Sequence, residues 1–370
     1  MPRLLVAISA HGLGHLGQAA PVCNALSALR PDLALSIWSA LPFATLKARI
    51  TAPFEHIAQP CDLGLIMHDA MRVDVPASWA SYAQRETQWH SALDAACALV
   101  HAAAPDLILS DVGDMPLAAA QALGIPGIAM SSLNWADTAR FYFESLPDSS
   151  AILDRLTRIY DNAPIALRLS PGMPMRGQEE IILPPVGAIS RYTRQALGDR
   201  VDHLIDPALR QRPRVLVGMG GIETQLAYAR WLEQTDLTLL VANQAQLPSE
   251  GLVAQGIVNA DTLCETANLV FTDLLNCCEA VICKPGYGTF VEAALANIPV
   301  LYVEREDWPE QRILVSWLEA NARCAKLEPD ALMRGDFTEA INALLAQPVK
   351  APIPQNGATV AATEILRWLD

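Results

Sequence analysis

Two histidines and one aspartate follow apolar stretches of the sequence in a pattern that could support proton transfer. Leu4–Ile8 predicts a first buried strand, and the loop after it contains His11 and His15. Leu107–Ser110 predicts another buried strand, which leads directly into Asp111. Because the carboxyl ends of parallel strands share one edge of a sheet, we expect Asp111 to lie beside the histidine loop. A histidine titrates near neutral pH and can take a proton from a hydroxyl, and a carboxylate can orient its imidazole.

Each of these residues also has a structural explanation. The histidines could be loop or cap residues, and Asp111 could cap the helix that the sequence predicts from Met115 to Leu123. The loop does not have the GxGxxG pattern, and no acidic residue ends the next strand, so a dinucleotide site is disfavoured. The aromatic residues between Trp79 and Phe143 fit either a core stripe or an apolar or sugar-stacking acceptor surface.

A second stretch predicts an anion site. Ala280–Cys283 predicts a buried strand, Lys284–Gly288 breaks the apolar pattern, and a helix that Thr289 would cap continues from Phe290. The first amides of a helix have no internal partner, and its dipole favours negative charge at that end. Glycines in the loop would let a ligand approach the backbone closely. Glu292 is expected on the first helical turn, within reach of a sugar hydroxyl beside a bound phosphate.

The chain is expected to form two α/β domains, because 370 residues can build two hydrophobic cores. Residues 1–170 would form an N-terminal Rossmann-like domain and residues 214–355 a C-terminal one. Residues 171–213 contain many prolines and glycines and are expected to be a linker. Residues 356–370 predict a helix, which could pack back on the N-terminal domain. Two such halves favour a cleft between domains that closes on a ligand.

The second half begins like the first, with a strand, a glycine loop and a helix. The strand is expected at Arg214–Val217, the loop at Gly218–Gly221 and the helix from about residue 223 to 234. This repetition of the same unit supports the division of the chain into two α/β halves.

Composition excludes several classes of protein. The net charge of −14 argues against nonspecific nucleic-acid binding and against a basic membrane-binding surface. Although 52% of the residues are hydrophobic, no uninterrupted apolar run has the length of a transmembrane helix, and peripheral membrane contact stays open. The eight cysteines form no CxxC pair, which favours buried free thiols in a reducing compartment. The short apolar run at the N-terminus is interpreted as a strand and not a signal peptide, so a cytoplasmic protein is expected.

With these motifs placed, the chain resembles the GT-B glycosyltransferases over most of its length. Lys284–Glu292, Ala296–Pro299 and Asp307–Gln311 look like the donor-nucleotide signature of the family 28 group, which includes the lipid II-forming N-acetylglucosaminyltransferase and, more distantly, the UDP-glycosyltransferases. The Gly-Tyr-Gly-Thr form of the glycine loop, with Leu109–Val112 and Ser131–Trp135, is closer to the glycosyltransferase-like N-terminal half of plant L-arabinokinase. The resemblance implies a GT-B fold, an α/β architecture with two Rossmann-like domains whose parallel sheets face each other across a cleft.

The resemblance also implies a role for each matching residue. A nucleotide-sugar donor would be held by Gly220, Gly221, Gly286, Tyr287, Gly288, Thr289, Glu292, Asp307 and Gln311. In this set Glu292 would bind the ribose hydroxyls, the loop amides the diphosphate, and Gln311, with or without Asp307, the donor sugar. His15 would be the base or orient the acceptor, Asp111 would be its partner, and His11 and Gly14 would lie on the acceptor side. Lys284 and Pro285 stand where many relatives have Ser or Gly.

The reaction implied by the resemblance is transfer of a sugar from a nucleotide diphosphate sugar, with UDP-sugars as the first candidates, to an acceptor hydroxyl. Direct attack by the acceptor would invert the anomeric centre. No Asp-x-Asp motif is present, which fits transfer without a metal and without any cofactor. The acceptor, a glycan, a lipid-linked molecule or a small molecule, stays open, and no nucleic-acid partner is expected. Two alternatives are a GT-B-fold nucleotide-sugar 2-epimerase and a non-catalytic nucleotide-sugar-binding module.

Overall fold

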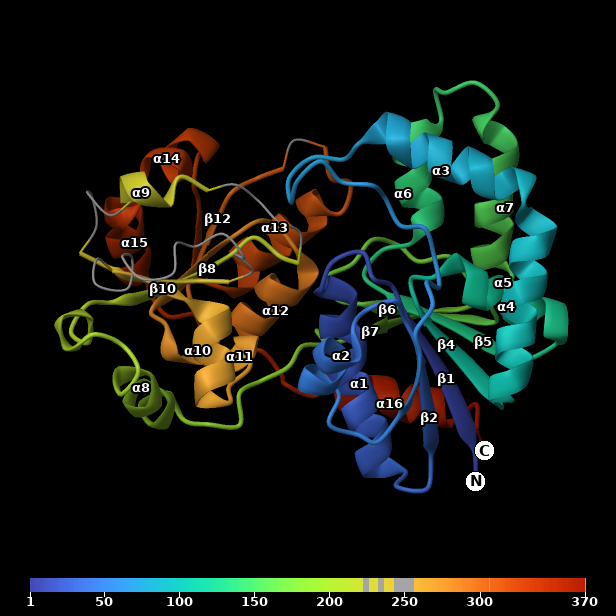
Figure 1. Ribbon diagram of the computed structural model, residues 1–370, viewed down its shortest axis with the longest axis horizontal. Coiled ribbons are helices and arrows are strands. Elements are labelled where there is room, and N and C mark those ends of the chain that lie inside the picture. The colour runs from blue at the N-terminus through green and yellow to red at the C-terminus, as the bar shows by residue number, and fades with distance from the viewer. Residues whose placement is uncertain (222–225, 232–235, 243–255, 306, 370) are drawn as a thin grey trace. The chain divides into compact units, whose positions relative to one another are not determined.

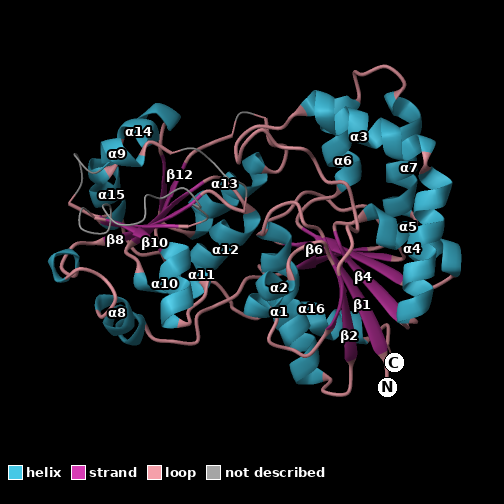
Figure 2. Ribbon diagram, in the orientation of Figure 1, coloured by secondary structure: helices cyan, strands magenta, loops and turns pink. Residues whose placement is uncertain are grey.

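The computed structural model describes residues 1–221, 226–231, 236–242, 256–305 and 307–369 (Figure 1). Its contacts divide the chain into two units. The first unit comprises Met1–His68, Val73–Gly187 and Pro354–Asp370, and the second comprises Asp69–Arg72 and Ala188–Ile353. Each unit is built around its own parallel sheet (Figure 2), as the sequence predicted.

The first unit contains a seven-stranded parallel sheet in the order β3-β2-β1-β4-β5-β6-β7. The strands are β1 (Arg3–Ile8), β2 (Ala34–Trp38), β3 (Glu55–Ile57), β4 (Leu107–Asp111), β5 (Gly127–Ser131), β6 (Ile165–Leu169) and β7 (Glu180–Leu183). The central strands are apolar and almost fully buried, which is typical of parallel strands covered on both faces. The strand order reverses between β1 and β4, and in such sheets this point forms a ligand crevice at the carboxyl ends of the strands.

Helices cover both faces of this sheet. They are α1 (Gly14–Leu29), α2 (Phe43–Arg49), α3 (Val75–Thr87), α4 (Trp89–Ala103), α5 (Asp114–Leu123), α6 (Trp135–Phe143), α7 (Ser149–Asp161) and α16 (Gly357–Leu366). Figure 1 shows α1 and α16 on one face and α4 and α5 on the other. Short polar residues cap two of these helices. The side chains of Asp74 and Asn134 accept hydrogen bonds from otherwise unpaired amides in the first turns of α3 and α6.

The last helix belongs to the first unit, where α16 packs against α1 and β7. It begins at Gly357, and a Cβ atom at that position would lie 2.1 Å from the carbonyl oxygen of Pro185. Glycine therefore permits the close approach that docks the C-terminal helix. Within the expected linker, residues 171–213, the structure instead forms β7, which extends the first sheet, and the helix α8 (Arg194–Asp202) of the second unit.

The second unit contains a six-stranded parallel sheet in the order β10-β9-β8-β11-β12-β13. The strands are β8 (Arg214–Gly218), β9 (Thr238–Val241), β10 (Ile257–Asn259), β11 (Ala280–Cys283), β12 (Val300–Tyr302) and β13 (Cys324–Lys326). Besides α8, the helices are α9 (Tyr228–Trp231), α10 (Ala260–Ala267), α11 (Phe271–Cys277), α12 (Tyr287–Leu295), α13 (Gln311–Asn321), α14 (Pro329–Arg334) and α15 (Thr338–Leu345). Of the helix expected at 223–234, residues 222–225 and 232–235 lie outside the described residues, and α9 is the described part.

Trp231 belongs to the hydrophobic core of the second unit and is fully buried. Its indole Nε1 donates a hydrogen bond of 2.6 Å to the carbonyl of Leu332, and its ring meets Phe337 edge to face at 5.5 Å. Apolar residues of β8, β9 and β11 complete this cluster. Among the described helices of the whole chain, none combines the length and the apolar character needed to cross a membrane.

A buried ion pair ties α3 to α5 in the first unit. The guanidinium of Arg85 lies 2.7 Å from the carboxylate of Asp114, and both side chains are almost completely buried. Removing one member leaves the other charge buried without its partner, so we expect Asp114→Ala to lower the free energy of unfolding of this unit by about 3–5 kcal/mol. Faster hydrogen exchange of the β1 and β4 amides would measure the loss in this unit specifically.

The matched control is Asp32→Ala, which removes an exposed carboxylate from its 3.0 Å pair with Arg30. Exposed pairs contribute at most about 1 kcal/mol, so the control should leave the exchange rates almost unchanged. Equal exchange rates in the two variants would show that the Arg85–Asp114 pair does not stabilise the unit.

Candidate functional site

His15 and Asp111 lie together at the carboxyl edge of the first sheet. β1 and β4 are neighbours in register, with Ile8 opposite Asp111, and α1 begins at Gly14, one residue before His15. This arrangement brings Nδ1 of His15 to 3.0 Å from Oδ1 of Asp111. The exposed fraction is 6% for His15 and 0% for Asp111. With Nδ1 facing the carboxylate, the imidazole can present a basic Nε2 for proton transfer.

Burial governs the electrostatics of this pair. Desolvation raises the pKa of Asp111, and the hydrogen bond and charge of His15 oppose that rise. The buried carboxylate therefore depends on His15, whose hydrogen bond and charge are the largest contributions that lower the pKa of Asp111. A protonated imidazole next to a carboxylate is the state that a histidine base reaches after it accepts a proton.

The turn after β4 holds Asp111 in an unusual backbone setting. Val112 has φ of +67°, a conformation that β-branched residues rarely adopt. The hydroxyl of Tyr160 donates a hydrogen bond to the Val112 carbonyl, and the Ser110 hydroxyl donates to the Gly113 carbonyl at 2.6 Å. Such strained conformations persist where the surroundings hold them, and they are frequent at functional sites.

His11 and Gly14, the two residues expected on the acceptor side, have different environments. The ring of His11 is half-buried and meets the edge of Trp135 at 5.2 Å, and the same indole lies 6.1 Å from the ring of His15. Gly14 is exposed, and a Cβ atom there would meet nothing within 4 Å. The structure thus groups both histidines around one buried indole and leaves Gly14 in open space.

Asp62 is a residue of this site that the sequence analysis did not identify. It accepts a hydrogen bond of 2.7 Å from Nε1 of Trp135 and another from the hydroxyl of Ser9. The loop around Asp62 has no strand or helix pattern that would indicate its position. The sequence analysis named Trp135 only within the segment Ser131–Trp135. Gln18 is a second such residue, and its side chain joins α1 to Ser131 and Ser132 at the end of β5.

In the second unit, Lys284 lies against the glycine loop that follows β8. Gly220 has φ of +87°, and a Cβ atom at this position would lie 2.9 Å from Cε and 3.5 Å from Nζ of Lys284. Burial, together with the neighbouring charge of Arg305, lowers the pKa of Lys284 to about 7, and the charge of Glu310 opposes this shift. The adjoining Gly221 is exposed. An amine placed this way gains its full charge when an anion binds beside it.

The motif at Asp307–Gln311 surrounds Arg305. The side-chain oxygen of Gln311 accepts a hydrogen bond of 2.6 Å from the backbone amide of Arg305. The guanidinium of Arg305 stacks on Trp308 at 4.2 Å and donates to the carbonyl of Ala70 at 2.9 Å. Asp307 and Gln311 are both half-buried. Gln311 therefore holds the backbone of Arg305, whose charge acts on Lys284. The sugar-binding role that the resemblance implies for Gln311 stays a prediction.

The start of α12 corrects two expectations. Thr289 does not cap this helix: Gly286 is the N-cap, Tyr287 is the first helical residue and Thr289 lies inside the first turn. The glycine backbone enters the helix three residues earlier than the side-chain pattern indicated. Glu292 consequently lies on the second turn, and only 3% of it is exposed.

The other candidate donor-binding residues of this motif form the N-cap and the first turn of α12. Tyr287 is buried, while Gly286, Gly288 and Thr289 are half-buried. The side chains of the described residues contain no group of three or more His, Cys, Asp or Glu that could hold a metal ion.

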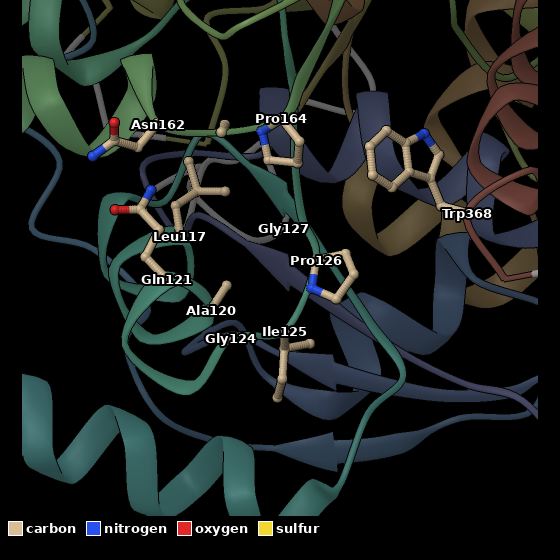
Figure 3. Close-up of a pocket in the computed structure, with 11 residues that line it drawn as sticks. Leu117, Ala120, Gln121, Gly124, Ile125, Pro126, Gly127, Asn162, Pro164 and Trp368 are labelled. Atoms are coloured by element: carbon tan, nitrogen blue, oxygen red, sulfur yellow. The ribbon is translucent and has the colours of Figure 1, made fainter.

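A surface pocket of about 320 Å³ lies elsewhere on the first unit (Figure 3). It is formed at the amino ends of β5 and β6, where Gly127 and Pro164 line it, and Trp368 lies across from them. The His15–Asp111 pair lies at the opposite, carboxyl edge of the same sheet. None of the residues lining this pocket is charged, and Gln121 and Asn162 are its polar side chains. It therefore contains no group for acid–base chemistry.

The fold resembles solved glycosyltransferases over the whole chain. It matches the glycosyltransferase of kitacinnamycin with 15% identity and a TM-score of 0.62, covering 100% of both chains. It matches the glycosyltransferase VinC in complex with dTDP with 18% identity and a TM-score of 0.56, covering 100% of this chain and 95% of that one. It matches UGT2 of Phytolacca americana, complexed with UDP-2-fluoroglucose and pterostilbene, with 16% identity and a TM-score of 0.57, covering 100% of both.

At these identities the similarity shows the fold, which is that of the GT-B glycosyltransferases. No protein-family model and no curated protein sequence matches the chain. The activity must therefore be argued from the residues of the two candidate sites.

Proposed function

We propose that this protein is an inverting, metal-independent glycosyltransferase that moves a sugar from a nucleotide diphosphate sugar to an acceptor hydroxyl. The observation that carries the proposal is the buried pair of His15 and Asp111, 3.0 Å apart at the carboxyl edge of the first sheet. The glycosyltransferase fold and the anion-binding features around Lys284 support it.

The dyad would supply the base. Nε2 of His15 takes the proton of the acceptor hydroxyl as the oxygen attacks the anomeric carbon, and Asp111 stabilises the imidazolium that forms. Because the acceptor attacks directly, the bond to the diphosphate breaks as the new glycosidic bond forms, and the anomeric centre inverts.

The second unit would bind the donor. The first amides of α12 and the ammonium of Lys284 would stabilise the diphosphate leaving group, so no metal or other cofactor is required. Glu292 would bind the ribose, and Gln311 and Asp307 the sugar. VinC is complexed with dTDP and the Phytolacca enzyme with a UDP-sugar, so both nucleotides belong among the donors to test, with UDP first. We also infer a closer relation to the family 28 group than to other GT-B enzymes, from the motif between Lys284 and Gln311.

The test is calorimetric titration of UDP, GDP, dTDP, ADP and CMP into the wild-type protein and into Glu292→Ala. We expect one diphosphate to bind at micromolar concentration and the variant to bind it at least about 10-fold more weakly, because a lost hydrogen bond to a charged group costs about 1.5–3 kcal/mol. Glu292→Gln keeps the volume of this buried side chain and separates lost charge from altered packing. The exposed Glu339 provides the control variant, Glu339→Ala.

Two results would redirect the proposal. If none of the nucleotides binds, the donor site is wrongly assigned. If one binds and its sugar derivative is converted to an epimer without any acceptor, the protein is an epimerase. Binding without any turnover indicates a non-catalytic module.

A further inference from the structure

Asp62 occupies a position that the His15–Asp111 pair does not explain. Its loop packs against both turns that carry the dyad. A Cβ atom at Gly64 would lie 3.1 Å from the ring of His11, and one at Gly113 would lie 3.1 Å from the carbonyl oxygen of Cys61. The loop therefore lies between the turn after β1 and the turn after β4, and it brings a second carboxylate, that of Asp62, to the site.

The hydrogen bonds of Asp62 are those of a carboxylate anion. Nε1 of Trp135 donates to Oδ2 at 2.7 Å, and the Ser9 hydroxyl also donates. Ser9 and Trp135 are both completely buried, so bulk water could not replace Asp62 as the acceptor of these two hydrogen bonds. Desolvation raises the pKa of Asp62, while the two hydrogen bonds and the charge of His15 lower it. Asp62 and His15 thus affect each other electrostatically.

We propose that Asp62 is a positioning residue that acts on the base: together with Asp111 it stabilises the protonated form of His15 and holds Trp135 against both histidine rings. This inference rests on the proposed function of the dyad. In a site that excludes water, a second negative charge near the imidazole strengthens the base and stabilises the ion pair that proton transfer creates. Asp111 fixes the orientation of the ring, and Asp62 adds charge without a direct hydrogen bond to it.

The other titratable groups around the two residues come from several elements. They include His11, Cys23, Cys61, Tyr82, Arg85, Asp111, Asp114 and Tyr160. Burial raises the pKa of Cys23 and of Tyr160, so both are uncharged near neutral pH. Arg85 is paired with Asp114 at 2.7 Å, and burial raises the pKa of Cys61 and of Tyr82, so both stay uncharged near neutral pH. Asp62 and Asp111 are two negative charges that act on His15.

The experiment is a titration of the His15 ring by nuclear magnetic resonance in the wild-type protein and in Asp62→Asn. Asparagine keeps an oxygen for the Trp135 N–H and removes the charge. Loss of a nearby negative charge destabilises the imidazolium, so the pKa of His15 should fall by on the order of one unit. The His15 signal is assigned by its loss in His15→Gln. Asp94→Asn, an exposed change on α4, should leave the titration unchanged.

Activity provides the second readout once a donor is known. In Asp62→Asn the acid limb of the kcat/KM profile should move to lower pH by the same amount as the pKa of His15. The value of kcat should fall about 10-fold because the base is weaker. The KM for the donor should not change. Trp135→Phe keeps an aromatic ring but removes the N–H that holds Asp62, and it should shift the titration in the same direction by less.

The outcomes are separable. An unshifted His15 titration in a folded Asp62→Asn protein would overturn the inference, whatever the activity. If Asp62→Asn does not fold, an unshifted titration in Trp135→Phe overturns it instead. Absence of transfer by the wild-type protein with every donor tested would overturn the proposed function, and the titration would still decide whether Asp62 acts on His15.

Discussion

Replacing His15 with alanine is expected to lower kcat for sugar transfer by about 10²–10⁴-fold, the usual contribution of a general base. The imidazole lies beside Asp111 with Nδ1 engaged at 3.0 Å, so its loss removes the proton acceptor and leaves the carboxylate in place. The affinity for the nucleoside diphosphate should be unchanged, because the residues proposed to bind it belong to the second unit. Steady-state kinetics and calorimetry on the same preparation measure the two quantities.

A histidine far from the dyad provides the control. His101 is exposed on α4, and His101→Ala should transfer sugar at the wild-type rate. Asp111→Asn adds a further comparison, since the amide can no longer stabilise an imidazolium even where it occupies the same space. Full activity in His15→Ala would show that another group takes the proton and that the base is misassigned.

Binding of the diphosphate is expected to weaken as the pH rises above about 7. Burial and the charge of Arg305 lower the pKa of Lys284 to about this value. Below that pH the amine is already charged in the free protein. Above it, binding requires uptake of a proton, because the anion raises the pKa of Lys284, and the affinity should fall by up to about 10-fold per pH unit. The diphosphate keeps its own charge in this range, since the second pKa of a phosphate is about 6.

Calorimetry at pH 7, 8 and 9, in buffers of different ionisation enthalpy, measures both the affinity and the proton uptake. Lys284→Met should bind about 10–100-fold more weakly at pH 7, as expected for a lost hydrogen bond to a charged group, and its affinity should not vary with pH. Lys350→Met, at an exposed lysine, should behave like the wild type. Equal affinity from pH 7 to 9 in the wild-type protein would show that Lys284 does not contact the anion.

Much of the architecture could be predicted from the sequence because it depends on local pattern. Apolar runs such as Leu4–Ile8 and Ala280–Cys283 form central parallel strands, and glycine loops follow β1, β8 and β11. Once those strands are parallel, their carboxyl ends must share an edge, so His15 and Asp111 were expected at the same edge. The adjacency of β1 and β4 in the structure then brings them to 3.0 Å. The class of fold is determined at this level.

Local pattern was insufficient where the backbone, and not side-chain periodicity, decides the structure. The helix after β11 begins at Gly286 and not after Thr289, which moves Glu292 to the second turn and into the interior. Residues 180–183 form a seventh strand within a segment whose prolines and glycines suggested a linker. The seventh strand pairs in register with β6, a partner that the local sequence does not reveal.

The sequence by itself predicted two parallel α/β sheets, the positions of the glycine loops and a histidine and an aspartate at one edge of a sheet. The tertiary structure alone decided that Asp62 reaches Trp135 and that Lys284 lies on Gly220. Asp62 lies on an irregular loop, and Lys284 meets a glycine 64 positions before it in the chain. Such contacts depend on how distant segments of the chain pack together. The resulting burial also lowers the pKa of Lys284. Neither the packing nor the burial can be read from the local sequence.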